Sequence, residues 1–144
     1  MTRFEDGKLI PGQVLVIGTG NTPVEQVAPK RSRDYFFDGP LGNLTDDGVM
    51  VGSHRYEWNS TLAPIASVDF NKVVTWNGIT EASDEVRANL TKTIKEAHAK
   101  KIETRFWDTP GWPAFARDRV NTLLLELGSD WINADDLEDI AKRW

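Results

Sequence analysis

The chain has 144 residues, a net charge of −5 and no cysteine. This length suffices for a substantial core, so we expect residues 1–144 to form a single domain. The negative charge argues against nucleic acid or an anionic membrane surface as a partner, and the lack of cysteine excludes disulfides and thiolate chemistry.

No apolar run reaches the roughly 20 residues that a membrane span needs. The first twelve residues also lack the apolar core of a signal peptide. We therefore expect no membrane span, and the sequence leaves the localisation unknown.

The first predicted strand is residues 13–17 (QVLVI), an apolar run typical of a parallel strand buried on both faces. Asn21 follows it in a glycine-containing turn, where the missing third glycine and Walker lysine argue against a phosphate loop. Pro23 starts a short helix near residues 24–27. The second predicted strand, residues 34–38, ends on the carboxylate of Asp38.

The middle of the chain is less regular. Residues 1–12 and 41–63 show no sustained period, so we expect a loose lead-in and a long loop. A short helix near residues 68–72 then precedes a third strand over 73–78, which ends on Trp76 and Asn77.

A long helix capped by Ser83 comes next. Its apolar positions recur at helical spacing, and we expect them to face the core: Val86, Leu90, Ile94 and Ala97. We interpret His98 as structural, because a cation is favoured near a helix C-terminus.

The most informative segment is residues 102–113, IETRFWDTPGWP. It begins as a strand suited to a buried pleated surface and then turns sharply after Trp107 and Asp108. A Trp-Asp-Thr-Pro turn has a free-energy cost that a purely structural role does not explain. We therefore interpret Trp107 and Asp108 as site residues rather than as packing residues.

A helix over residues 114–127 follows, and Gly128 ends it. The fifth predicted strand begins at Trp131 and has a polar end, Asn133-Ala134-Asp135-Asp136. Asp135 or Asp136 then caps the final helix. A capping role alone is the stronger interpretation of Asp136.

This order repeats a strand and a helix five times, which predicts an α/β fold with a parallel sheet. Carboxyl ends of parallel strands share one edge, where binding residues gather. The predicted substrate-binding residues at this edge are Asn21, Asp38, Trp76, Asn77, Trp107, Asp108, Asn133 and Asp135.

Several blocks resemble a known family: VIGTGNTP, RDYFFDGPL, PIASVDF, VVTWNG, AHAKKIETRFWDTPGWP and LLELGSDWINADDLEDIA. They look like the C-terminal half of the phospholipase-C-like phosphodiesterase barrels, which are related to glycerophosphodiester phosphodiesterases. The resemblance is strongest to the fungal altered inheritance of mitochondria protein six family. It implies a partial, half TIM-type β/α barrel of about five parallel strands, each followed by a helix. A whole barrel takes about 250 residues.

The resemblance implies a phosphoric diester hydrolase that acts on a glycerophosphodiester or a phospholipid headgroup. The full-length family binds a divalent cation, Mg²⁺ or Ca²⁺. Its catalytic histidines and acidic metal ligands lie on first strands that this chain lacks, so we expect no metal site, no cofactor and negligible activity in this chain alone. Trp107 resembles the strand-seven tryptophan of the substrate pocket, and Asp135 resembles the strand-eight polar residue.

Ser53-His54-Arg55 contains the His-Arg pair that opens the active site of glycerophosphodiester phosphodiesterases. The Glu-x-Asp spacing that follows the pair in those enzymes occurs nowhere in this sequence. His54 is therefore a weak catalytic candidate, and we interpret it as a solvated loop histidine.

A second class of function stays open: a non-catalytic α/β module that binds a small polyol or sugar on a rim rich in tryptophan and carboxylates. In either case a half barrel leaves two free strand edges. We therefore expect self-association or a complementary N-terminal half as the protein partner.

Overall fold

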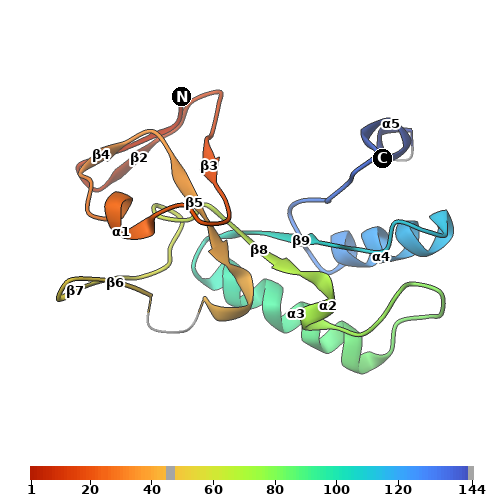
Figure 1. Ribbon diagram of the computed structural model, residues 1–144. Coiled ribbons are helices and arrows are strands. Elements are labelled where there is room, and N and C mark those ends of the chain that lie inside the picture. Colours follow the sequence, from red (N-terminus) through yellow and green to blue (C-terminus); the bar gives the residue numbers. More distant parts are fainter. Residues whose placement is uncertain (45–47, 143–144) are drawn as a thin grey trace.

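The computed structural model describes residues 1–44 and 48–142. Its central sheet has four parallel strands in the order β3-β5-β8-β9 (Figure 1). Their bounds are Ile17–Gly18 for β3, Phe36–Pro40 for β5, Ile65–Asp69 for β8 and Glu103–Trp107 for β9. The sequence predicted β9 closely, and it predicted β5 two residues too early.

Helices pack on one face of this sheet. The long helix α3 (Asp84–Ala99) runs beneath β8 and β9, and α4 (Ala114–Glu126) follows β9 (Figure 1). Thr104 and Phe106 of β9 are fully buried, whereas Arg105 between them is only partly buried. This alternation shows that one face of β9 meets the core and the other does not.

The predicted stripe of α3 lies in the core, with Leu90, Ile94 and Ala97 buried and Val86 packed against them. Ser83 caps the helix as expected, because its side chain accepts a hydrogen bond from the Val86 amide. Strong local signals, a cap and a 3.6-residue period, made this element predictable.

Two antiparallel hairpins occupy segments that we expected to be irregular. Strands β1 (Arg3–Glu5) and β2 (Lys8–Ile10) pair around Asp6-Gly7, and β4 (Ser32–Arg33) extends this small sheet. Both turn residues have positive φ, as in the type of hairpin turn that an Asp-Gly pair favours. The prediction of an irregular lead-in is therefore wrong, and the Asp-Gly pair is the sequence signal that indicates the hairpin.

The second hairpin lies inside the predicted long loop. Strands β6 (Val49–Val51) and β7 (His54–Tyr56) pair around Gly52, whose φ is +61°. A one-turn 3₁₀ helix η1 (Leu41–Asn43) follows β5, and the short helix α1 (Val24–Val27) lies where it was predicted.

The prediction of a third strand over residues 73–78 is wrong, because the structure has no strand there. Strand β8 lies at residues 65–69 instead, and α2 (Phe70–Val73) follows, with Asp69 accepting a hydrogen bond from the Asn71 amide as its cap. The segment beyond it is apolar because Val74 and Trp76 are buried in the core, although its backbone pairs with no strand of the described chain.

The fifth predicted strand is reduced to one parallel bridge between Trp131 and Arg105. The last helix, α5 (Leu137–Ala141), is capped by Asp136, which accepts a hydrogen bond from the Asp139 amide. No helix within residues 1–44 and 48–142 has the length and apolar character needed to cross a bilayer.

Candidate functional site on the open face of the sheet

The face of the sheet that lies away from α3 carries polar side chains from three adjacent strands. Asp38 of β5, Ser67 of β8 and Arg105 of β9 are each partly buried. The register pairs Ser67 directly with Arg105, while Asp38 lies opposite Ile65, two residues before Ser67. Side chains two residues apart share a face, so the three lie together.

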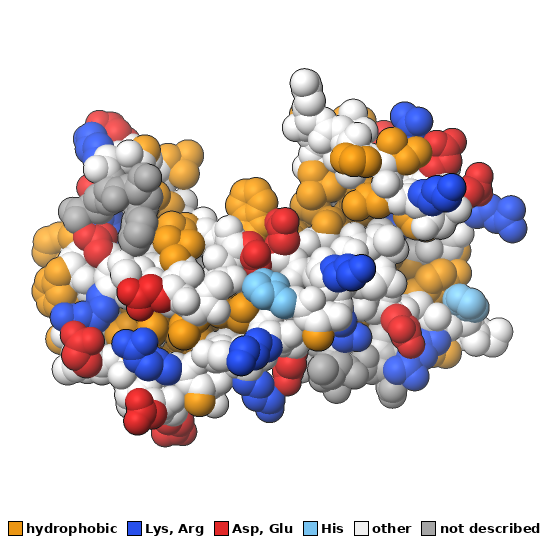
Figure 2. Space-filling model, turned by 180° about the vertical axis from the view of Figure 1, so that it is seen from behind, with side chains coloured by type: hydrophobic (Ala, Val, Ile, Leu, Met, Phe, Trp, Pro, Cys, Tyr) orange, Lys and Arg blue, Asp and Glu red, His pale blue; other side chains and the backbone are white. Residues whose placement is uncertain are grey.

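This open face lies in a notch of the molecule. Seen from behind, the surface is hollowed between the side that bears β1, β2 and β4 and the side that bears α5 (Figure 2). Hydrophobic side chains appear on both walls of the notch, and hydrophobic and acidic side chains lie at its bottom (Figure 2).

Arg105 is the centre of the polar group. Its guanidinium donates one hydrogen bond to the Ser67 hydroxyl, 3.4 Å away, and another to Oδ1 of Asn133. The bridge at Trp131 brings the Asn133 segment beside β9. In the part of the chain that the structure describes, no carboxylate forms an ion pair with Arg105, so its remaining N–H groups are available to a ligand.

Asp38 has an unusual environment. Its Oδ1 atom is buried and has no hydrogen-bond partner. Burial raises the pKa of the Asp38 carboxyl, and hydrogen bonding from Ser67 together with the charge of Arg105 opposes this only in part. The carboxyl therefore has a buried acceptor atom without a partner and a lowered cost of protonation.

A second polar group lies where β9 ends. Trp107 is 39% exposed, and Asp108 follows it with a φ of +55°. The Asn71 amide holds this turn by donating to Oδ2 and to the backbone oxygen of Asp108, at 3.2 and 3.3 Å. Such strained backbone in a residue other than glycine often marks a functional position.

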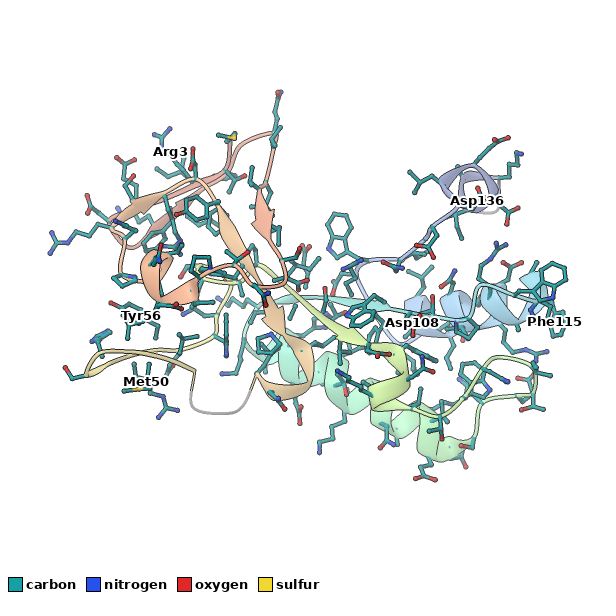
Figure 3. All side chains as sticks on the ribbon, viewed as in Figure 1. Arg3, Met50, Tyr56, Asp108, Phe115 and Asp136 are labelled. Carbon is teal, nitrogen blue, oxygen red and sulfur yellow. The ribbon has the colours of Figure 1, made fainter. Side chains whose placement is uncertain are left out.

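Asp108 also lines a cleft of about 180 Å³ together with Asn133, Asp135 and Arg117. Figure 3 labels Asp108 near the end of β9 and Asp136 at the start of α5, which lies above Asp108 in that view. Arg117 of α4 forms ion pairs with Asp118, at 3.0 Å, and with Asp139, at 2.5 Å, and the second pair fastens α5 over this cleft.

Four of the eight predicted residues are thus linked at this end of the sheet, through Arg105 or the cleft: Asp38, Asp108, Asn133 and Asp135. Trp107 is the last residue of β9, two residues after Arg105. Asn21 is exposed beyond β3. Trp76 is 8% exposed in the core, where its indole donates to the Thr80 carbonyl at 3.0 Å. The Asn77 side chain closes a turn by accepting from the Ile79 amide.

The turn at Asn77 also lies on the helical side of the molecule. Arg119 of α4 donates to the carbonyl oxygens of Gly78 and Ile79, at 2.9 and 2.7 Å. Trp76 and Asn77 therefore belong to the packing between this turn and α4, and the structure does not bring them to the open face.

Neither histidine joins the polar group. His54 is exposed on the β6–β7 hairpin, where its ring packs edge-on against Tyr56 with centroids 4.5 Å apart. His98 hydrogen-bonds to Oδ2 of Asp130 at 2.9 Å, which agrees with the structural role expected for it. Among the described residues no three His, Asp or Glu side chains cluster closely enough to hold a metal ion, so the residues present do not fit the divalent cation of the resembling family.

Sequence reasoning missed the two residues at the centre of the site, Ser67 and Arg105. A signal for Arg105 exists, because alternation along β9 places it on the face opposite Thr104 and Phe106. Ser67 gives no such signal, since the sequence predicts a short helix from residue 68 and no strand before it.

Homologues of this chain are named altered inheritance of mitochondria protein 6. A homolog of that name from Arthroderma benhamiae is 38% identical over 144 residues, which cover 95% of this chain and 41% of that protein. The proteins from Eremothecium gossypii and Candida glabrata are 26% and 30% identical, and the matches cover 36% of each. The chain thus spans about two fifths of the length of these relatives.

No family model matches the chain. No solved structure matches it either.

Proposed function

We propose that this chain forms the substrate-facing part of a phosphoric diester hydrolase, as half of a TIM-type β/α barrel. The substrate class is a glycerophosphodiester or a phospholipid headgroup. One observation carries the proposal: Arg105 lies on the uncovered face of a parallel sheet, oriented by Ser67 and Asn133, with no carboxylate paired to it in the described chain.

A guanidinium in this setting suits a phosphodiester. Its planar fork donates two parallel hydrogen bonds to phosphate oxygens, and Ser67 and Asn133 fix its orientation in advance. Asp38 lies on the same face one strand away, where its charge interacts with that of Arg105. Trp107 would cover an apolar part of the ligand, because its indole is partly exposed beside the same strand.

Bond cleavage needs groups that this part of the sheet does not provide. Phosphodiester hydrolysis by general acid and base requires two proton-transferring side chains beside the phosphate. A divalent cation would neutralise the phosphate charge, but the described residues offer no ligand set for it. The chain alone therefore binds the substrate class without turning it over.

Titration with glycerophosphocholine tests the proposal, with amide NMR shifts and calorimetry as the measurements. We expect shifts at residues 67, 105 and 133, and a loss of at least tenfold in affinity for Arg105→Met. The matched control is Arg87→Met, which removes the same charge from an exposed position of α3. Equal affinity of Arg105→Met and the control would refute the proposal.

The alternative function is a polyol- or sugar-binding module. Exposed indoles support it, because Trp107, Trp112 and Trp131 are 39%, 84% and 50% exposed. The Trp131 indole is also fixed in place by donating to Glu103 at 2.7 Å. Binding of myo-inositol to wild type and Arg105→Met alike, with no preference for the phosphate-bearing ligand, would favour this alternative.

A further inference from the structure

A second cleft lies at the amino ends of the strands. It has a volume of about 530 Å³ and is enclosed by the β1–β2 turn, the segment between α1 and β4, and the segment that runs from β7 to Leu62. Figure 3 labels Tyr56 on this side of the molecule, beneath α1 and far from Asp108. The cleft is therefore separate from the site around Arg105.

Arg33 is the notable residue of this cleft. It is only 6% exposed, and its Nε atom has no hydrogen-bond partner. The other guanidinium nitrogens donate to the carbonyl oxygens of Lys30 and Thr61. The guanidinium lies over the ring of Phe4, 4.1 Å from its centroid, and 5.5 Å from that of Phe36.

These partners are all neutral. In the described part of the chain no carboxylate forms an ion pair with Arg33. Burial lowers the pKa of the Arg33 guanidinium, with the nearby Tyr35 opposing it, yet an arginine stays protonated at neutral pH. A buried cation without an anionic partner is costly, so the site has an electrostatic reason to take up an anion.

The lining of the cleft extends this positive character. Three cationic side chains on one segment line it, and two carboxylates lie on other segments: Lys30, Arg31 and Arg33, with Asp6 and Glu57. This local surplus is opposite in sign to the net charge of the chain, which is −5. Apolar side chains, including Phe4 and Leu62, complete the wall, and the volume lies in the range of small-molecule sites.

We propose that this cleft binds a phosphomonoester of a small organic molecule, with Arg33, Lys30 and Arg31 holding the phosphate. Arginine and lysine are the residues that recognise phosphate oxygens, and a phosphate would supply the anionic partner that the buried Arg33 lacks among the described residues. The organic part of the ligand would lie against Phe4 and Leu62. The phosphate comes either from a soluble metabolite or from a lipid headgroup such as phosphatidic acid.

Titration of the ¹⁵N-labelled chain with inorganic phosphate and then with glycerol 3-phosphate tests this site. We expect amide shifts at residues 30–33, 61 and 62, with tighter binding of the ester. The double variant Lys30→Ser with Arg31→Ser should lose at least fivefold in affinity, and Arg33→Met should lose all measurable binding. Vesicles that contain phosphatidic acid, compared with neutral vesicles, distinguish the lipid from the soluble source.

The matched control is Arg87→Ser with Lys92→Ser, which removes the same two charges from the exposed side of α3. Because the buried Arg33 also supports the fold, the variant at Lys30 and Arg31 decides the matter if Arg33→Met does not fold. No amide shift in this cleft at 50 mM phosphate, or equal affinities for the double variant and its control, would overturn the proposal.

Discussion

Arg105 and Ser67 occupy paired positions of the neighbouring parallel strands β9 and β8, and the guanidinium donates to the Ser67 hydroxyl over 3.4 Å. The same hydroxyl also acts on Asp38 of the next strand, where hydrogen bonding from Ser67 lowers the carboxyl pKa. Three adjacent strands thus present a guanidinium, a hydroxyl and a carboxyl group in a row, and the Ser67 hydroxyl links the outer two.

Ser67→Ala tests this coupling. Loss of the hydroxyl should raise the pKa of Asp38 further, because one of the groups that lowers it is gone. Arg105 should also lose one anchor, which we expect to weaken binding of glycerophosphocholine about three- to tenfold, the scale of one hydrogen bond. Carboxyl ¹³C NMR titration gives the pKa, and Ser53→Ala in the β6–β7 turn is the control.

Asp38→Asn should stabilise the fold at neutral pH. The folded-state pKa of Asp38 lies above the unfolded value of about 3.9. Because the folded state favours the protonated carboxyl, the stability that Asp38 contributes is fully present below about pH 3.9. This stability is lost as the pH rises through the folded-state pKa. We expect the variant to gain roughly 1 kcal/mol in free energy of unfolding at pH 7, because a partly buried charge is removed.

Urea unfolding at pH 7 and at pH 3.5 measures this difference. The gain should shrink at the lower pH, where Asp38 is mostly protonated in both states of the wild type. Asp34→Asn, at an exposed position just before β5, serves as the control. A variant less stable than wild type at pH 7 would show that the Asp38 charge is needed by the fold.

Asp130→Asn should have the opposite effect. Burial alone would raise the pKa of Asp130, but hydrogen bonds from His98 and from the amide and hydroxyl of Thr104 outweigh it and hold the pKa below its ordinary value. The stability from this carboxylate is present above about pH 3.9 and is lost as the pH falls through the lower folded-state pKa.

The Asp130 side chain is about one third exposed, so solvent screens part of this effect. We expect Asp130→Asn to lose about 1 kcal/mol in free energy of unfolding at pH 7. The difference in free energy of unfolding between wild type and Asp130→Asn should be smaller in unfolding curves measured below pH 3.5. An equal deficit at both pH values would mean that packing, not charge, explains the destabilisation.

The elements with strong local signals were predictable. The helix α3 has a serine cap and a 3.6-residue apolar period, and β9 combines β-favouring residues with a sharp turn. The segment at residues 73–78 misled the prediction because its apolar residues are buried for another reason. Gly78, with a φ of +78°, packs against the Ala116 carbonyl of α4, and only tertiary structure reveals this contact.

Only the part of the candidate site that lies in turns was predictable, because turns carry local sequence signals. Strand-end residues such as Asp108 and Asn133 follow visible turns, so the chain itself marks them. Ser67 and Arg105 lie within strands, and their importance depends on which strands are neighbours. The buried Arg33 was missed because nothing near it in the sequence shows that its cationic side chain has only neutral partners.

The isolated chain should show no appreciable phosphodiesterase activity with any divalent metal. His54 lies on the β6–β7 hairpin and His98 is bound to Asp130, so neither transfers a proton at the open face. Loss of one general acid or base typically lowers a rate by about 10²–10⁴-fold. Hydrolysis of glycerophosphocholine at ordinary enzyme rates, abolished by His54→Ala, would contradict this prediction and make His54 catalytic.

The last prediction is that the purified chain is not a simple monomer. We expected residues 13–17 to be buried on both faces, yet Val14, Leu15 and Val16 are 54%, 41% and 40% exposed. In the described sheet β3 pairs with β5 along one side only, so its outer edge is open to another strand. An exposed apolar edge of this kind promotes association, either with a second copy or with a complementary N-terminal half.

Light scattering at micromolar concentration measures the association. We expect a mass above that of one chain, and Leu15→Lys should reduce it, because it places a charge in the exposed apolar segment that leads into the edge strand β3. Leu9→Lys, on the β1–β2 hairpin with a similar exposure of 40%, adds the same charge away from this edge and should leave the association unchanged. A monodisperse monomer that unfolds cooperatively would show that the edge needs no partner, and the expectation of a complementary half would fall with it.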